Sequence, residues 1–248
     1  MGDRISFTHR KRTFHVPRPA SADYIIGQIE RRGSFYERQL LVALAARVGQ
    51  GTVALDCGAN IGNHALFFAG VMGLSVHAFE PVARNADLLA QTVAMNGLGD
   101  RVRIVPTALS DRVAMVAMST PDAGNPGMFR ISASGEGVVT DTLDGYMLAQ
   151  GIDPAALALI KIDVEGHEAQ VLRGGRATLQ QTGAIVTAEM ATLVEYDAIL
   201  EVLAPCGYHP TGVFCTTPTV MFEKGDAAFA DVRPVIAAYQ AKTDRRGA

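Results

Sequence analysis

Apolar residues along the chain recur in two spacings, one typical of helices and one typical of buried strands. Helical spacing is found at residues 35–48, where Ser34 could cap the first turn, and at residues 83–96. Short apolar runs rich enough to be buried parallel strands occur at residues 52–57, 75–80, 102–109, 156–165 and 183–190. Because the two patterns alternate, the sequence predicts an α/β fold with a mostly parallel sheet and helices on both faces.

Three segments depart from this alternation. Residues 1–33 are irregular and partly basic, and we expect an N-terminal arm or short hairpin ahead of one domain at residues 34–248. Residues 112–141 contain short strand-like runs, the last of which starts at residue 137 and continues to residue 143, separated by glycine-rich and proline-rich turns; this pattern predicts a small β-rich insertion. The runs at residues 207–214 and 218–224 predict a closing antiparallel pair before a polar C-terminal helix.

Composition narrows the class of protein. The 248 residues are 48% hydrophobic and carry a formal net charge of −3, which argues against a nucleic-acid partner. No apolar run reaches the ~18 residues of a membrane-spanning helix, and the N-terminus lacks the apolar block of a secretory signal. Cys57, Cys206 and Cys215 are widely spaced, which favours reduced thiols over a disulfide or zinc site. We therefore expect a cytoplasmic protein without a membrane partner.

A glycine-containing turn joins the first predicted buried strand to the next helix. It reads Leu-Asp-Cys-Gly-Ala-Asn-Ile-Gly-Asn-His at residues 55–64. Glycines in such a turn allow a tight bend and a close approach to a ligand, and the next helix directs its N-terminus toward that ligand. The dinucleotide fingerprint requires Gly-x-Gly-x-x-Gly, whereas this chain has Asn60 and Asn63 at two of the glycine positions. An NAD-linked oxidoreductase is therefore only an alternative.

Glu80 ends the next predicted strand, 18 residues after Gly62. A carboxylate at this place can accept hydrogen bonds from both hydroxyls of a ribose. A plain turn beside a surface glutamate is the simpler explanation of the two features. Because they fall at the ends of consecutive strands, we favour a cofactor that contains a nucleoside.

Several motifs together resemble the FkbM family of S-adenosylmethionine-dependent methyltransferases. They are LDCGANIGNH, AFEP, TDTLD, KIDVEGHE and VLRGG, and the resemblance extends over roughly residues 34–223. It implies the Rossmann-like class I methyltransferase fold, with seven strands of which the last is antiparallel. It also implies a set of residues that contact S-adenosylmethionine: Tyr36, Glu37, Asp56, Gly58, Asn60, Gly62, Asn63, Glu80, Pro81, Ala108, Leu109 and Asp163.

The stretch LIKIDVEGHE, at residues 159–168, places several charges at the end of a core strand. Alternate side chains of a strand share a face, so Lys161, Asp163 and Glu165 point the same way. An isolated buried charge is very costly, so Lys161 requires a partner, for which Asp163 and Glu189 are candidates. We favour a buried ion pair that links two strands over a direct catalytic role for Lys161.

His167, Asp163 and Glu165 are the predicted catalytic residues. In the family, this strand end faces the methyl group and the acceptor. His167 has an ordinary pKa of ~6.5 and could remove a proton from an acceptor hydroxyl, while Asp163 or Glu165 orients it or acts as the base. A local hydrogen-bonding role for His167 at a helix start is equally compatible with the sequence. We assign no metal ligands, although a divalent cation held by Asp163, Glu165 and His167 or Glu189 is a less favoured alternative.

The resulting hypothesis is a methyltransferase that acts on a hydroxyl oxygen of a small molecule, a sugar or a natural-product intermediate. The alternatives are the NAD-linked oxidoreductase and a cofactor-binding protein without catalytic activity. The acceptor pocket is expected to involve residues 1–33 and 119–137, which contain no sequence motif that identifies the acceptor. A homo-oligomer is compatible with the sequence, which contains no signal for or against it.

Overall fold

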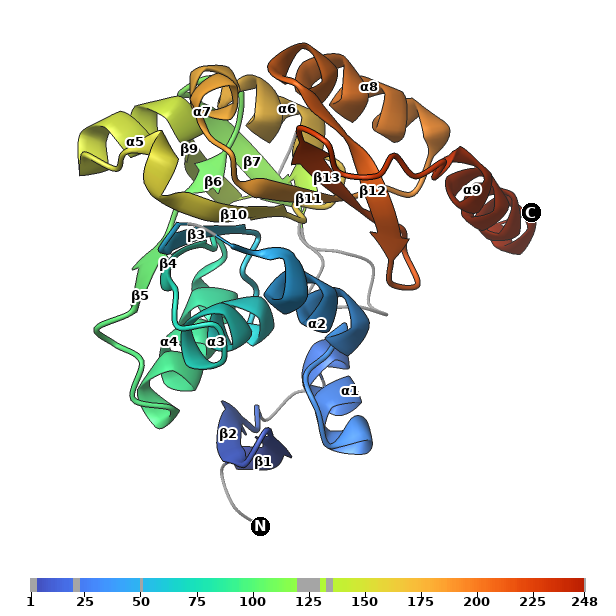
Figure 1. The fold of residues 1–248 in the computed structure, drawn as a ribbon. Helices are drawn as coiled ribbons and strands as arrows, with labels where there is room; N and C mark the ends of the chain where they lie inside the picture. The colour runs from blue at the N-terminus through green and yellow to red at the C-terminus, as the bar shows by residue number, and fades with distance from the viewer. Residues whose placement is uncertain (1–3, 20–22, 50, 120–129, 133–135, 248) are drawn as a thin grey trace.

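A central sheet of seven strands organises the molecule (Figure 1). The computed structural model describes residues 4–19, 23–49, 51–119, 130–132 and 136–247. In spatial order the strands are β12 (Tyr208–Phe214), β13 (Thr219–Lys224), β11 (Ile185–Glu189), β10 (Leu157–Ile162), β3 (Val53–Cys57), β4 (Ser75–Phe79) and β5 (Val102–Val105). Only β13 runs antiparallel to its neighbours, so the predicted mostly parallel sheet is confirmed.

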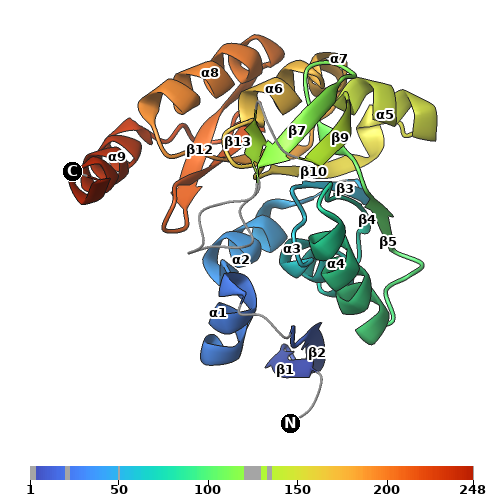
Figure 2. The ribbon, with the colours of Figure 1, turned by 180° about the vertical axis from the view of Figure 1, so that it is seen from behind.

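Helices cover both faces of this sheet, as predicted (Figures 1 and 2). One face is packed by α2 (Arg38–Arg47), α3 (Asn63–Gly70) and α4 (Ala83–Met95), and the other by α5 (Leu143–Gln150), α6 (Glu168–Arg173), α7 (Arg176–Gln181) and α8 (Leu193–Leu203). Side chains of β10 reach both cores: Leu159 joins the first, and Ile160 and Ile162 join the second. The C-terminal helix α9 (Arg233–Gly247) contacts α8, and no helix of the described residues is long and apolar enough to span a bilayer.

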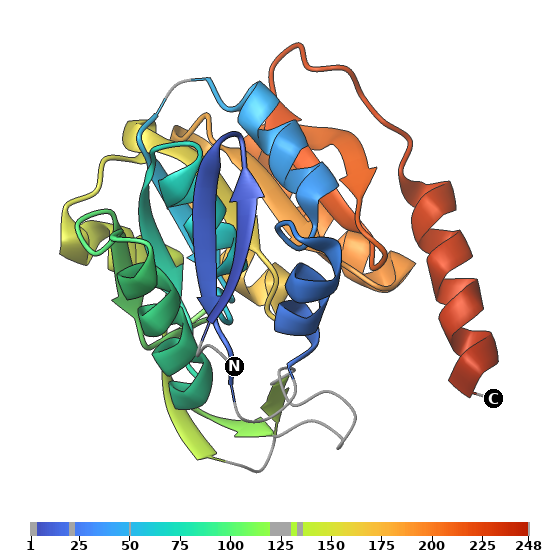
Figure 3. The same ribbon diagram turned by 90° about the horizontal axis from the view of Figure 1, so that it is seen from below.

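The N-terminal residues begin with a hairpin that is packed into the first of these cores. Strands β1 (Arg4–His9) and β2 (Arg12–Pro17) are antiparallel, and α1 (Tyr24–Arg32) follows them. The rings of Phe7 and Phe14 lie 4.8 Å and 5.0 Å from that of Phe35, which itself lies 5.1 Å from Phe67 of α3. Figure 3 shows the hairpin lying between α4 and α1.

A smaller second sheet corresponds to the predicted β-rich insertion. It consists of β6 (Ala108–Leu109), β9 (Glu136–Asp141), β7 (Met115–Ser119) and β8 (Arg130–Ser132) in that order. One correction concerns the strand predicted at residues 102–109. Its pairing with the central sheet ends at Val105, and residues 108–109 pair with β9 instead. The parts of the insertion at residues 120–129 and 133–135 lie outside the described residues.

Two local predictions were wrong. Ser34 does not cap the helix predicted at residues 35–48: its hydroxyl donates to the Phe35 carbonyl, and α2 starts after Glu37, which has a left-handed φ of 54°. The run at residues 137–143 was interpreted as a strand throughout, but α5 begins within it at Leu143. The cause is Thr142, whose hydroxyl accepts from the Gly145 amide and caps the new helix.

Candidate active site

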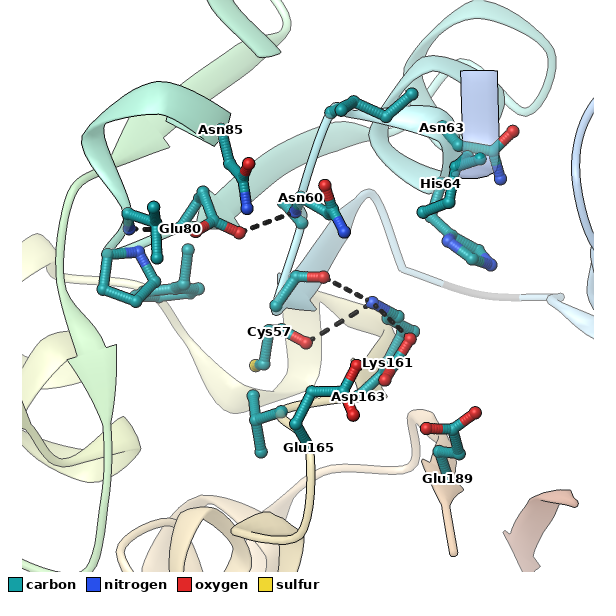
Figure 4. Close-up of a pocket in the computed structure, with 18 of the residues that line it drawn as sticks. Cys57, Asn60, Asn63, His64, Glu80, Asn85, Lys161, Asp163, Glu165 and Glu189 are labelled. Carbon is teal, nitrogen blue, oxygen red and sulfur yellow. Dashed lines mark hydrogen bonds and ion pairs between the residues drawn. The ribbon is translucent and has the colours of Figure 1, made fainter. Parts of the chain in front are cut away.

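A cavity of about 290 Å³ opens at the carboxyl ends of β3, β4, β10 and β11 (Figure 4). Ligands bind at this edge of open α/β sheets. Its wall includes all three predicted catalytic residues and most of the predicted cofactor site: Tyr36, Glu37, Gly58, Asn60, Asn63, Glu80, Pro81, Ala108, Leu109, Asp163, Glu165 and His167. Asp56 and Gly62 were also expected to contact the cofactor, but neither is part of this wall.

The glycine turn bends tightly because two other segments of the chain press against it. Gly58 has a φ of +80°, and a Cβ added there would lie 1.8 Å from the carbonyl oxygen of Asp163. Gly62 has a φ of +89°, and its added Cβ would lie 2.5 Å from Leu89 of α4. Contacts within the protein therefore already require a glycine at both positions.

Glu80 connects the end of β4 to the glycine turn. Its two carboxylate oxygens accept the backbone N–H of Asn60 at 2.8 Å and that of Val82 at 2.9 Å. Burial raises the pKa of the Glu80 carboxyl to about 7, although these hydrogen bonds act in the opposite direction. The two features that the sequence paired, the turn and the acid, thus lie in direct contact.

Two side-chain oxygens beside Glu80 are buried without a hydrogen-bond partner in the described part of the chain. They are Oδ1 of Asn60 and Oδ1 of Asn85, a residue of α4 that the sequence analysis did not select. Buried polar atoms are usually satisfied, so two unused acceptors in a cavity wall favour a ligand that brings hydrogen-bond donors. The hydroxyls and amines of a nucleoside cofactor match that requirement.

Lys161 forms the buried ion pair that the strand pattern predicted. It has one partner, Asp56, that the sequence did not indicate. Its ammonium lies 3.1 Å from Asp56 on the adjacent strand β3 and 3.6 Å from Asp163, and it donates to the Gly58 carbonyl at 2.8 Å. Burial alone would lower the pKa of this ammonium, but Asp56 and Asp163 raise it above its usual value. Asp56 is fully buried, so its carboxylate compensates Lys161 from behind the cavity wall.

His167 is held by a hydroxyl that the sequence did not reveal. Its Nε2 lies 2.9 Å from the hydroxyl oxygen of Ser110, and that hydroxyl is a donor to Asp111 at 3.4 Å. Burial lowers the pKa of the half-buried His167 imidazole, and the nearby Asp111 carboxylate acts in the opposite direction. The ring is therefore uncharged at neutral pH and able to accept a proton.

Carboxyl groups gather where β10 and β11 end. Glu189 ends β11, and its pKa is raised well above the usual value by burial and then by Asp163 and Glu165. Glu37 lies 3.2 Å from the His64 imidazole of α3. Burial raises the Glu37 pKa, but His64, Cys215 and Lys161 together lower it by more, so the pKa is below its usual value. In the described part of the chain, no three histidine, cysteine or acidic side chains are arranged to hold a metal ion.

The loop after β10 is fixed by Glu168, the first residue of α6. One of its carboxylate oxygens accepts the backbone N–H of Val164 at 2.9 Å and that of Gly166 at 3.1 Å. Burial raises the pKa of Glu168 to about 7. Glu168 therefore shapes the loop that carries Glu165 and His167.

Four residues near the cavity have a positive φ without being glycine. Glu37, Asn60 and Glu165 belong to its wall, and Cys215 is a hydrogen-bond partner of Glu37. Such a conformation costs about 1–3 kcal/mol for a residue other than glycine, and residues that adopt it cluster at functional sites. The unfavourable backbone geometry and the unpaired oxygens thus both support this cavity as the functional site.

Comparison with known proteins identifies the family. The model of the methyltransferase FkbM domain matches residues 56–210. The chain belongs to the FkbM methyltransferase family. The resemblance read from the motifs is therefore confirmed, and this FkbM chain places the matched glycine turn, Glu80 and the LIKIDVEGHE segment around one cavity.

Other proteins are similar to this chain in sequence or in fold. Hexuronic acid methyltransferase AglP of Haloferax volcanii is 26% identical over 154 residues, which are 60% of this chain and 61% of that relative. The chain thus spans about three-fifths of its length. Sp1610 of Streptococcus pneumoniae, solved with S-adenosyl-L-methionine, is 13% identical with a TM-score of 0.51, covering 84% of this chain and 88% of its own. A FkbM methyltransferase of Methylobacillus flagellatus is 16% identical with a TM-score of 0.49, covering 82% and 63%. The fold is that of class I methyltransferases.

Proposed function

We propose that this FkbM protein transfers the methyl group of S-adenosylmethionine to a hydroxyl oxygen of a small molecule or sugar. One observation carries the proposal: a single cavity joins a region suited to a nucleoside, around Glu80 and Asn60, to a region suited to proton removal, around Asp163 and His167. Membership of a methyltransferase family and the sugar acid named for the Haloferax volcanii relative support this choice.

The residues around Glu80 would hold the nucleoside. The Glu80 carboxylate retains lone pairs beyond its two backbone hydrogen bonds, and the unpaired Oδ1 atoms of Asn60 and Asn85 are further acceptors. The two ribose hydroxyls and the amino groups of the cofactor would supply donors for these acceptors. When bound, S-adenosylmethionine supplies the electrophilic methyl carbon, and the protein contributes mainly alignment and proton transfer.

His167 is the proposed base. The Ser110 hydroxyl donates its proton to the Asp111 carboxylate, so its oxygen accepts from N–H at Nε2 of His167. The lone pair at Nδ1 is then free to accept the proton of an acceptor hydroxyl. Because burial lowers the pKa of this imidazole, it is uncharged and competent at neutral pH. Asp163, about one-third exposed, is the alternative base in the same wall.

The first experiment measures cofactor binding by calorimetry. We expect S-adenosylmethionine and S-adenosylhomocysteine to bind the wild-type protein, and Glu80→Ala to weaken both by about 10–100-fold, as loss of hydrogen bonds to a charged group does. Asp87→Ala, which removes an exposed carboxylate of α4, is the control and should bind normally. Absence of binding heat with the folded wild-type protein would overturn the proposal.

The second experiment separates an enzyme from a cofactor-binding protein without activity. Methyl transfer from labelled S-adenosylmethionine to a panel of hydroxylated acceptors is measured for the wild type and for His167→Ala. We expect kcat to fall by about 10²–10⁴-fold in the variant, and the loss of activity below neutral pH to disappear with it. Bound cofactor without transfer to any acceptor would favour the non-catalytic alternative, and full activity of His167→Ala would refute the assigned base.

A further inference from the structure

One exposed aromatic side chain belongs to the wall of the cavity. It is Tyr24, the first residue of α1, and 55% of it is exposed to solvent. Other large apolar side chains are exposed in the described part of the chain, but none of them lines this cavity. Ligand cavities use aromatic side chains as contact surfaces, and the nucleoside region around Glu80 leaves this ring without a role.

Tyr24 lies toward Glu189 rather than toward the nucleoside region. Its ring meets that of Tyr36 edge to face, with the centroids 6.1 Å apart. Burial is the main cause of the raised pKa of Tyr36, and the nearby Tyr24 and Glu189 add to it, so both lie close to the Tyr36 hydroxyl. Figure 4 shows Glu189 and Glu80 on opposite sides of Lys161.

The position of the Tyr24 ring is fixed by the backbone on both sides of it. Asp23 caps α1, because its Oδ1 accepts the backbone N–H of Ile26 at 3.0 Å. The backbone of Tyr36 is bound to Asn63 of α3, whose Oδ1 accepts its N–H at 3.0 Å and whose amide donates to its carbonyl at 3.1 Å. A ring that is held in this way loses little conformational freedom when a ligand packs against it.

Polar oxygens surround the exposed ring. Asp23 uses Oδ1 for the cap, and its second carboxylate oxygen has no hydrogen-bond partner in the described part of the chain. The turn that carries the exposed Thr216 lies beside Glu189, because Thr219 pairs with Glu189 in the register of β11 and β13. This end of the cavity therefore combines one aromatic face with several oxygen atoms that accept hydrogen bonds.

Resting on the function proposed above, we propose that the acceptor is a sugar in its ring form, which stacks one face on Tyr24 and donates its hydroxyls to Asp23 and Glu189. A pyranose carries apolar C–H groups on its face and hydroxyl donors around its rim, so it matches both features. A phenol would also stack on the ring, but it would bring few donors for the surrounding oxygens. Tyr24 thus selects the class of acceptor and takes no part in cofactor binding.

Saturation-transfer NMR tests the proposal with the methyl pyranosides of glucose, galactose, mannose and glucuronic acid, and with phenol. Each probe is titrated with and without S-adenosylhomocysteine, so the result does not depend on whether the cofactor binds. We expect at least one pyranoside to bind, with the strongest transfer to the hydrogens of one ring face. Tyr24→Ala should weaken this binding by about 5–20-fold, and Tyr24→Phe by less than about twofold, because the ring makes the contact.

Two controls separate an acceptor surface from other roles of Tyr24. Phe229→Ala removes another aromatic ring, 69% exposed and outside the cavity wall, and should leave sugar binding unchanged. Calorimetry with S-adenosylhomocysteine should give the same affinity for Tyr24→Ala as for the wild type, within about twofold. A ring that covers the cofactor would instead weaken cofactor and sugar binding together.

Five results would each overturn the acceptor proposal. They are the absence of binding by all the pyranosides, tighter binding of phenol than of any pyranoside, unchanged sugar binding in Tyr24→Ala, an equal loss in Tyr24→Phe, and a matching loss of cofactor affinity. Failure of the proposed function is recognised separately, by the absence of binding heat with S-adenosylmethionine and S-adenosylhomocysteine in the wild type.

Discussion

Lys161 is a buried cation whose charge is matched across two strands. Its ammonium lies between Asp56 of β3 and Asp163 at the end of β10, and only 4% of its side chain is exposed. Removing one partner of such a pair leaves a buried charge without compensation. The stability of the sheet centre therefore depends on all three side chains together.

Replacing Lys161 with Met should lower the free energy of unfolding by about 3–5 kcal/mol, because Asp56 would remain buried without its counterion. Urea denaturation followed by circular dichroism measures this change. Lys242→Met, on the exposed surface of α9, is the control and should change stability by less than about 0.5 kcal/mol. Equal stability of the two variants would contradict the ion-pair interpretation.

Strand alternation predicted that Lys161 needs a partner, but it identified only one of the two partners. Asp163 is two residues away on the same face, so the sequence pointed to it directly. Asp56 became visible only when β10 paired with β3 in a register that sets Lys161 opposite Asp56. The same limit applies to Ser110 and Asn85, because no local pattern links them to His167 or Glu80.

Glu168 provides a test in which stability depends on pH. Its pKa is about 7 in the folded protein against an ordinary 4.5, so the folded state holds this proton more tightly than the unfolded state. Its contribution to stability is therefore largest at low pH and decreases as the pH rises from about 4.5 to about 7. Glu168→Gln keeps an oxygen for the amides of Val164 and Gly166 and removes the ionisation.

We expect Glu168→Gln to become more stable than the wild type as pH rises from 5 to 8, by up to about 3 kcal/mol. Glu168→Ala loses both hydrogen bonds and should be less stable than Glu168→Gln at every pH, by about 1–3 kcal/mol. Free energies of unfolding from urea titrations across this pH range test both statements. A constant difference between the wild type and Glu168→Gln would disprove the raised pKa.

At the scale of elements, the structure confirms the strands and helices that have strong apolar runs. The central strands β3, β4, β10 and β11 are buried on both faces, so their apolar composition identified them. Helix α5 was missed because its first turn is set by the hydroxyl of Thr142 rather than by an apolar repeat. In the site, the sequence identified the glycine turn. It did not show why the turn needs glycines, because that depends on which segments of the chain pack against them.

Gly58 should be the most sensitive glycine of this turn. Gly58→Ala would place its Cβ 1.8 Å from the Asp163 carbonyl at a φ of +80°, so β10 would have to move away from β3. We expect a loss of about 3 kcal/mol or more in the free energy of unfolding, measured by urea denaturation. Gly183→Ala is the control, because no atom lies within 4 Å of its added Cβ. Similar stability of both variants would show that this close contact is unimportant.

At the scale of the whole molecule, the two faces of the sheet have separate apolar cores, and the N-terminal hairpin extends one of them. Phe7 and Phe14 reach the same cluster as Phe35 and Phe67, although these residues come from four different elements or loops. The sequence predicted an arm or short hairpin ahead of the domain at residues 1–33, but it did not show where this segment packs, because two short strands carry little pattern by themselves. Their packing depends on the aromatic rings of later segments.

Phe14→Ala should therefore weaken the whole molecule and not the hairpin alone. Truncating this buried ring should cost about 3–5 kcal/mol and leave a single unfolding transition. Urea denaturation combined with amide hydrogen exchange along the chain distinguishes the two cases. Leu148→Ala, at a position 85% exposed on α5, serves as the control with little expected change. Faster exchange confined to residues 4–17 would instead define a separate arm.

The order in which the cavity wall is encoded has a consequence for synthesis on the ribosome. The wall begins at Asp23 and is completed only by Thr216 and Thr217, in the turn between the last two strands of the sheet. At ~5–20 residues per second, roughly 10–30 s of translation separate the emergence of the glycine turn from that of this closing turn. A nascent chain thus exposes its strand-end carboxylates long before it can enclose a ligand, and a complete site exists only after nearly all of this sequence has left the exit tunnel.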